Sequence, residues 1–174
     1  MSQSIHDFHD DPRNAGILIW INGALKARVD ATVSVFDSGF VLGDGVWEGL
    51  RVVGGHPVFL DAHLDRLYEG ARAIALNIGL TRAELMNDGV HIRLMVTRGV
   101  KRTPYQDPRV TVGPATIVIL PEWKLAKPET LSAGLRLFTV HVRRGFPDVQ
   151  DPKLNSHSKL NCITACIQAT EAGA

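Results

Sequence analysis

The segment DPKLNSHSKLNCITACIQATEAGA, residues 151–174, contains the most informative change of pattern in the sequence. An extended approach leads to a turn rich in Ser, His and Asn, and residues 160–172 then have the apolar spacing of an amphipathic helix that ends at Gly173. Lys153 and Lys159 flank the junction between the strand and the helix. A lysine at this junction can reach a cofactor bound at the start of the helix. We therefore expect the chemistry of the chain in this segment.

The composition restricts the class of protein. The sequence is 45% hydrophobic and 21% charged with a net charge of +1, which indicates neither nucleic acid nor an anionic membrane as a partner. No apolar run is long enough to span a membrane, and the polar N-terminus has no signal-peptide core. Cys162 and Cys166 lie four residues apart, which suits neither a CxxC pair nor a structural zinc site. We expect two small buried side chains, no metal site and a cytoplasmic protein.

Hairpins dominate the first part of the chain. Asn22-Gly23 is a strong turn signal between two apolar segments, and Gly54-Gly55 indicates a second hairpin. Residues 61–77 have the clearest helical stripe, with Asp61 as the expected N-cap, and a short helix is expected from Thr81. Strands are expected at residues 17–22, 24–29, 45–53, 56–60, 91–97, 115–120 and 135–142.

This order of elements predicts an α+β fold in two domains. We expect a flexible arm over residues 1–16, a small and nearly complete N-terminal domain over residues 17–120, and a Pro-rich linker over residues 121–131. Residues 132–174 would begin a larger domain that is truncated. A unit of this size is too small to hold a core alone, so we expect it to dock on the first domain or on a partner chain.

Several polar groups are candidates for chemistry, although each also has an ordinary structural interpretation. Glu48 lies in a strand beside Trp47, on what is otherwise a solvated hairpin. His63 and Arg66 share one face of the helix and could bind a phosphate, whereas an exposed arginine more often pairs with a nearby acid. Arg98 ends a strand, where it could meet a carboxylate or be solvated.

Taken together, these segments resemble the class IV aminotransferases, which are the fold type IV pyridoxal-phosphate enzymes. The resemblance runs from about residue 17 to the end of the chain. This class of enzymes includes branched-chain and D-amino-acid aminotransferases, amine transaminases and aminodeoxychorismate lyases. The motifs that carry it are WINGAL, FDSGFVLGDGVWEGLRV, DAHLDRL, VTRG, the Pro-rich linker and EAGA. The resemblance implies pyridoxal 5'-phosphate as cofactor, amino acids and 2-oxo acids as substrates, and a homodimer.

The resemblance also implies roles for individual residues. Arg66 matches the arginine that holds the cofactor phosphate. Phe40 matches the start of the pocket wall, and Trp47 matches an aromatic position that lines the substrate pocket, with Glu48 next to it as a further substrate-binding candidate. Arg98 matches a residue near the substrate side in the D-amino-acid branch. WEGLR is similar to the branched-chain branch and VTRG to the D-amino-acid branch. The motifs therefore leave both branched-chain and D-amino acids as candidate substrates.

The expected Schiff-base lysine falls on Asn155, counted back from the EAGA end of the helix. Asparagine cannot form a Schiff base, so Asn155 is kept only as a cofactor-binding candidate. Lys159 is the expected catalytic lysine, one turn further along the start of the helix. The alternatives are that the site has lost its lysine, that the residue was changed deliberately, or that Lys153 replaces it.

The expected function is therefore transamination of a branched-chain or D-amino acid through a lysine aldimine. One alternative is a lyase of the aminodeoxychorismate type, which uses the same cofactor without an amino acceptor. A further alternative is an inactive member of the family that survives as a binding or assembly module.

Overall fold

The computed structural model describes residues 11–81, 92–123, 132–134 and 136–173. The chain divides into two compact units. The first unit comprises Arg13–Trp123 and Lys153–Ser158, and the second comprises Met1–Pro12, Lys124–Pro152 and Lys159–Ala174. The short segment Lys153–Ser158 thus belongs to the first unit although its sequence neighbours belong to the second.

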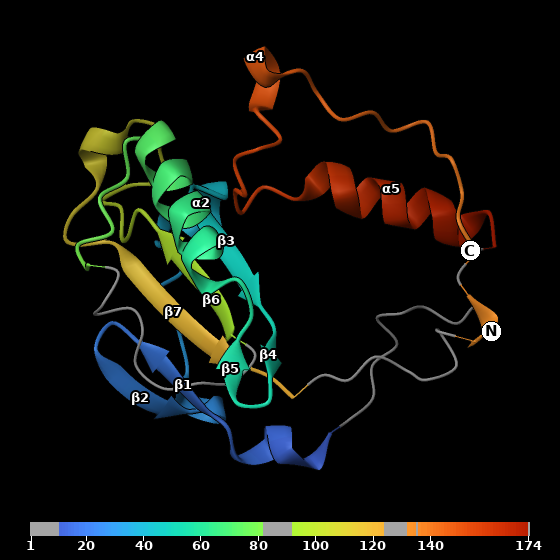
Figure 1. Cartoon of the computed structure of the whole chain (residues 1–174). Helices are drawn as coiled ribbons and strands as arrows, with labels where there is room; N and C mark the ends of the chain where they lie inside the picture. Colours follow the sequence, from blue (N-terminus) through green and yellow to red (C-terminus); the bar gives the residue numbers. More distant parts are fainter. Residues whose placement is uncertain (1–10, 82–91, 124–131, 135, 174) are drawn as a thin grey trace. The chain divides into compact units, whose positions relative to one another are not determined.

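A five-stranded antiparallel sheet forms the first unit, in the order β2-β1-β7-β6-β3 (Figure 1). Asn22 and Gly23 both have positive φ, of 48° and 93°, which is the geometry of the tight turn expected between the first two strands. The hairpin and the later strands at 91–97 and 115–120 are confirmed. The strands are β1 (Leu18–Ile21), β2 (Ala24–Ala27), β3 (Gly45–Leu50), β6 (Ile92–Thr97) and β7 (Thr116–Pro121).

The second expected hairpin is much shorter than predicted. It consists of β4 (Val52–Val53) and β5 (His56–Pro57), which form a separate two-stranded sheet. Gly54 and Gly55 have φ of 59° and 83°, so this turn also uses a conformation that glycine adopts readily. The turn was therefore predicted correctly, while the strands on either side of it end sooner.

Helix α2 (Leu60–Ala73) covers one face of the sheet (Figure 1). Its stripe of Leu64, Leu67 and Ala71 is buried as expected, against a core built from β3, β6 and β7. The prediction of Asp61 as N-cap is wrong. The N-cap is Phe59, two residues earlier, with a φ of 54° and no side-chain cap, so the helix begins at Leu60.

Short helical turns connect the strands. Asp37 caps α1 by accepting a hydrogen bond of 2.8 Å from the Gly39 amide, and its other oxygen accepts from the Thr97 hydroxyl at 2.9 Å. Both contacts explain why Asp37 is buried. The turns are η1 (Pro12–Gly16), η2 (Arg28–Asp30), α1 (Ser38–Leu42) and η4 (Pro108–Val110).

Part of the expected N-terminal arm has defined contacts with the rest of the chain. Asn14 in η1 is buried, and its side chain exchanges two hydrogen bonds with the main chain of Trp123, at 2.8 and 3.1 Å. The Arg13 guanidinium lies 4.0 Å from the centre of the Trp123 ring. Arg13 and Asn14 therefore contact the segment that follows β7. The flexibility expected for the arm stays a prediction, and residues 1–10 lie outside the described residues.

The second unit contains α4 (Pro147–Gln150) and α5 (Leu160–Glu171). The expected closing helix is confirmed, with Gly173 at φ 88° directly after the capping residue Ala172. The strand expected at 135–142 is wrong where the structure describes it: residues 136–142 are irregular, and Leu137 is 89% exposed. An apolar alternation forms a strand only where it finds a partner ladder and a face to bury. The helix expected from Thr81 falls on residues 82–91, outside the described residues.

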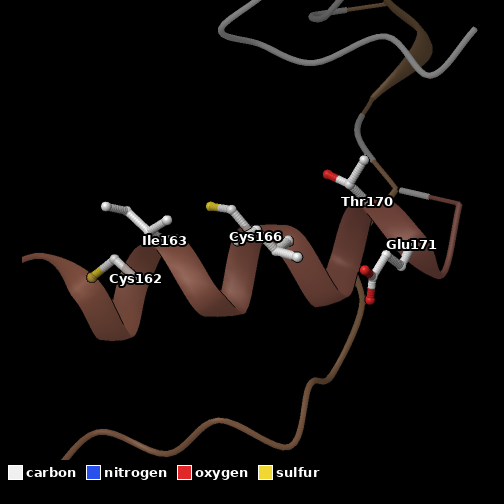
Figure 2. Close-up of a pocket in the computed structure, with 6 residues that line it drawn as sticks. Cys162, Ile163, Cys166, Thr170 and Glu171 are labelled. Atoms are coloured by element: carbon white, nitrogen blue, oxygen red, sulfur yellow. The ribbon is translucent and has the colours of Figure 1, made fainter.

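The two cysteines of α5 are exposed, contrary to the expectation that both are buried. Figure 2 shows Cys162, Ile163, Cys166, Thr170 and Glu171 along this helix, where they border a shallow hollow. The side chains of Ile163 and Ile167 are about half exposed as well. None of the site residues expected from the sequence borders this hollow. Within the described part of the chain, no helix has both the length and the apolar character that a membrane span requires.

Candidate functional site

The most concentrated group of charges lies where β3 meets α2. Residues in β3 alternate between its two faces, so Val46, Glu48 and Leu50 all point toward the core, and each is buried. The Glu48 side chain is 0% exposed. A buried carboxylate is stable only when charged or polar partners compensate for its lost hydration. The partners of Glu48 therefore define the site.

Two side chains of α2 supply those partners. Arg66 binds Glu48 in a bidentate manner, with Nε 2.6 Å from Oε1 and Nη2 2.6 Å from Oε2. His63 lies one turn earlier, and its Nδ1 is 2.7 Å from Oε2. Because an ionised carboxylate only accepts hydrogen bonds, Nδ1 of His63 is the donor. The hydrogen bond to Glu48 raises the pKa of the Arg66 guanidinium. We call these three residues the Glu48 cluster.

The Glu48 cluster brings together two of the site residues expected from the sequence, Glu48 and Arg66. His63 was expected to share a face with Arg66, and it does so through the common carboxylate. The hydrogen bonds that join Glu48 to Arg66 and His63 were not predicted. The alternation of β3 could have indicated them, because Glu48 lies two residues from the buried Val46 and two from the buried Leu50, on the same face of the strand. The Glu48 carboxylate points into the protein. Its contact with a substrate stays a prediction.

Arg98, expected on the substrate side, is used to hold the fold together. Its Nε and Nη2 donate to the Asp44 carboxylate at 2.6 and 3.0 Å. Nη1 donates to the Ala75 carbonyl at 2.9 Å, and Nη2 also donates to the Ile74 carbonyl at 2.7 Å. The guanidinium thus satisfies carbonyls at the C-terminal end of α2, which that end of a helix leaves without partners. Contact of Arg98 with a substrate stays a prediction.

The two aromatic residues expected in the pocket wall lie in different elements and differ in exposure. Phe40 is in α1 and is 70% exposed. Trp47 is half-buried in β3, on the face opposite Glu48, with the Arg93 guanidinium 5.2 Å from its ring centre. This arrangement is a cation–π contact on the second face of the sheet.

Asn155 lies beside β3 in the segment Lys153–Ser158. Its side-chain amide donates to the Trp47 carbonyl at 2.5 Å, and the Trp47 amide donates to the Asn155 carbonyl at 2.9 Å. Ser156 forms a β-bridge with Val46, and the His157 amide donates to the Gly45 carbonyl at 2.9 Å. The segment therefore lies along the outer edge of β3 and contacts it from Gly45 to Trp47.

This geometry corrects the expected relation between the two lysine candidates and Asn155. Lys159 was expected one helical turn beyond Asn155, but α5 begins only at Leu160, and residues 155–157 contact the edge of β3 instead of forming a helix. Lys159 is the N-cap residue of α5 and belongs to the second unit, whereas Lys153 and Asn155 belong to the first. A catalytic role for Lys159 stays a prediction.

Comparison with known proteins establishes the family. Residues 45–174 match the family model of the amino-transferases of class IV. The branched-chain-amino-acid aminotransferase-like protein 2 of Arabidopsis thaliana is 38% identical over 92% of this chain and 31% of its own length. The chain belongs to the class IV aminotransferase family.

Solved structures extend the comparison to the fold. A branched-chain amino acid aminotransferase from T.th., complexed with N-(5'-phosphopyridoxyl)-L-glutamate, aligns with a TM-score of 0.76 and 25% identity over 92% of this chain and 56% of that one. A 4-amino-4-deoxychorismate lyase from Pseudomonas aeruginosa aligns with a TM-score of 0.67 and 29% identity over 87% of this chain and 56% of that one. The expected α+β architecture of fold type IV is confirmed. The chain spans 31% of the Arabidopsis relative and 56% of each of these structures.

Proposed function

We propose that this chain binds pyridoxal 5'-phosphate and takes part in amino-group transfer between an amino acid and a 2-oxo acid. The observation that carries the proposal is Arg66, whose guanidinium is fixed on one edge by Glu48 while its side chain is 52% exposed. Arginine presents its donors in a planar fork that matches a phosphate. Arg66, held by the other residues of the Glu48 cluster, therefore fits the phosphate arm of the cofactor. When bound, the cofactor would act as the electron sink for bond breaking at the amino acid Cα.

The covalent anchor of the cofactor needs a lysine, and the residue at the expected position does not fit. Asn155 has no amine nucleophile, and its side chain is hydrogen-bonded to the Trp47 carbonyl. We therefore propose that Lys159 supplies the amine that holds the cofactor and moves the proton at Cα. Lys159 directly follows the segment that pairs with β3.

The second candidate is a family member that binds the cofactor phosphate without a covalent anchor. The engagement of the Asn155 side chain with the β3 main chain favours it, since an asparagine there contributes to structure and not to catalysis. In this candidate the fold serves binding or assembly. Replacing Asn155 by Lys would then create transaminase activity that the parent protein lacks.

One experiment separates the two candidates. The protein is incubated with pyridoxal 5'-phosphate, reduced with borohydride, digested and mapped by mass spectrometry. Phosphopyridoxyl mass on Lys159, lost in Lys159→Met and retained in Lys153→Met, is the expected result. Labelling of Lys153 alone contradicts the assignment of Lys159. Absence of any label together with retained reversible binding supports the second candidate.

The reaction class is tested by product analysis. The similarity to a 4-amino-4-deoxychorismate lyase makes a lyase the alternative to transamination. A transaminase needs a 2-oxo acid as amino acceptor, so the loss of amino acid should depend on added 2-oxo acid. Turnover that is equal with and without 2-oxo acid would favour the lyase. Branched-chain amino acids and D-alanine are the first donors to compare, and size-exclusion chromatography tests the proposed homodimer.

A further inference from the structure

We propose that Glu48 is a positioning residue: it holds one edge of the Arg66 guanidinium so that the opposite edge is presented to a phosphate monoester. The proposal rests on the proposed binding of pyridoxal 5'-phosphate and adds to it a reason why Arg66 can bind before the cofactor arrives. Glu48 itself would not touch the phosphate, because its side chain is 0% exposed.

The rigidity of Glu48 comes from the strand that carries it. β3 pairs with β6 along its whole length, from Gly45 opposite Thr97 to Leu50 opposite Ile92. Its other edge is covered by the segment Lys153–Ser158. A side chain at the centre of a strand bounded on both edges, with Val46 and Leu50 buried on either side, has little freedom to move.

Arg66 is held by the buried Glu48, while part of its own side chain is exposed at the surface. A guanidinium has five N–H groups, and Glu48 accepts from one at Nε and one at Nη2. Among the residues that the structure describes, neither N–H of Nη1 has a hydrogen-bond partner. The edge of the guanidinium that Glu48 does not use is therefore the edge with donors remaining for an anion. An arginine fixed in advance does not lose its side-chain freedom when the ligand binds.

His63 adds a second contact that orients the carboxylate. It donates to the same Oε2 that accepts from Arg66 Nη2, at 2.7 Å. The two donors leave the carboxylate one orientation in which all three hydrogen bonds are made. Glu48 thereby joins His63 and Arg66, although it lies 15 and 18 positions before them in the sequence.

Two possible roles of Glu48, neutralising the charge of Arg66 and positioning its guanidinium, predict opposite effects of substitution on anion binding. If Glu48 only neutralised Arg66, its replacement by Gln would strengthen the binding of an anion. If Glu48 positions Arg66, both Glu48→Gln and Glu48→Asp should weaken it, because Asp keeps the charge but is one methylene too short to hold the guanidinium in place. We expect a loss of about tenfold in affinity for the phosphate ligand.

The measurement compares pyridoxal 5'-phosphate with pyridoxal, which lacks the phosphate. The ratio of their dissociation constants isolates the phosphate contribution from all other contacts. We expect the phosphate preference to fall in Arg66→Met and in both Glu48 variants, and to be unchanged in Arg72→Gln, an exposed arginine further along α2. An unchanged preference in Glu48→Asp, or a stronger one in Glu48→Gln, overturns the proposal while the role of Arg66 stands. Absence of any phosphate preference in the parent protein overturns the proposed function itself.

A measurement on the unsubstituted protein covers the case in which the Glu48 variants do not fold. In a spectrum of 15N-labelled arginine, Nε–H of Arg66 should exchange slowly with water and be rigid before any ligand is added. The exposed Arg72 serves as the mobile reference. Fast exchange and high mobility at Arg66 would overturn the proposal, because an arginine that is not held cannot be positioned.

Discussion

Replacing Arg98 by Met tests whether this arginine holds the fold or serves a substrate. Methionine keeps much of the length and apolar contact of the side chain and removes the guanidinium. Four hydrogen bonds are lost at once, two to the Asp44 carboxylate and two to the carbonyls of Ile74 and Ala75. The ends of α2 and β6 then lose the group that joins them.

The size of the effect follows from burial. The side chains of Arg98 and Asp44 are only 11% and 20% exposed, so the ion pair is screened much less than a surface pair. Hydrogen bonds to charged groups contribute about 1.5–3 kcal/mol each, but Asp44 and the two carbonyls recover part of this from water once the arginine is gone. We expect the free energy of unfolding to fall by about 2–4 kcal/mol.

Urea denaturation monitored by circular dichroism measures this change as a shift in the midpoint at constant slope. The matched control is Arg109→Met, which removes another bidentate pair with an aspartate, Asp107, in which the arginine side chain is 89% exposed. The control should show no resolved change. If Arg98→Met is no more destabilising than Arg109→Met, the structural role of Arg98 is wrong. A stable Arg98→Met that has lost affinity for amino acids would instead favour its predicted contact with substrate.

Two further predictions concern Asp107 and the edge of β3. Hydrogen bonding to Arg109 lowers the pKa of Asp107 to about 2 from 3.8, so the small contribution of this exposed pair to stability is present above pH 3.8 and is lost as the pH falls through about 2. An NMR titration should show a higher Asp107 pKa in Arg109→Met, still below 3.8 because the backbone amide of residue 109 keeps its hydrogen bond to the carboxylate, and an unchanged pKa would contradict the pairing. A Cβ at Gly45 would lie 2.5 Å from the Val96 carbonyl oxygen, whereas one at Gly49 would meet only a ring atom at 3.4 Å. Gly45→Ala should therefore cost about 1–3 kcal/mol in thermal or urea unfolding and Gly49→Ala much less, and equal costs would refute the close strand contact.

Local patterns predicted the parts of the fold that depend on local physics. The Asn22-Gly23 turn needs positive φ at both positions, and those residue types tolerate it. The stripe of Leu64, Leu67 and Ala71 is buried because a period of 3.6 residues places the three on one face. The start of α2 was misplaced by one residue, since Phe59 adopts a left-handed conformation that no propensity of phenylalanine indicates.

The contacts that build the site could be predicted only in part. Glu48 and Arg66 were each singled out, but their pairing spans 18 positions and depends on how α2 crosses the sheet. The pairing of Arg98 with Asp44 spans 54 positions, and its carbonyl contacts depend on where α2 ends. Asn155 was identified as the unexpected residue at the lysine position. Its hydrogen bond to the Trp47 carbonyl depends on an irregular segment meeting a strand residue that lies 108 positions away.

The pairing of Lys153–Ser158 with β3 has a consequence for how the protein can be shortened. A strand edge without a partner is a template on which another chain can add, and such edges promote aggregation. A chain that ends before residue 153 would retain every strand of the five-stranded sheet yet expose the outer edge of β3. Solubility should therefore drop sharply between chains ending after residue 158 and chains ending at residue 150, even though both contain the whole of Arg13–Trp123. The segment thus covers the sheet edge, and the sheet depends on residues that lie about 108 positions after the strand they cover.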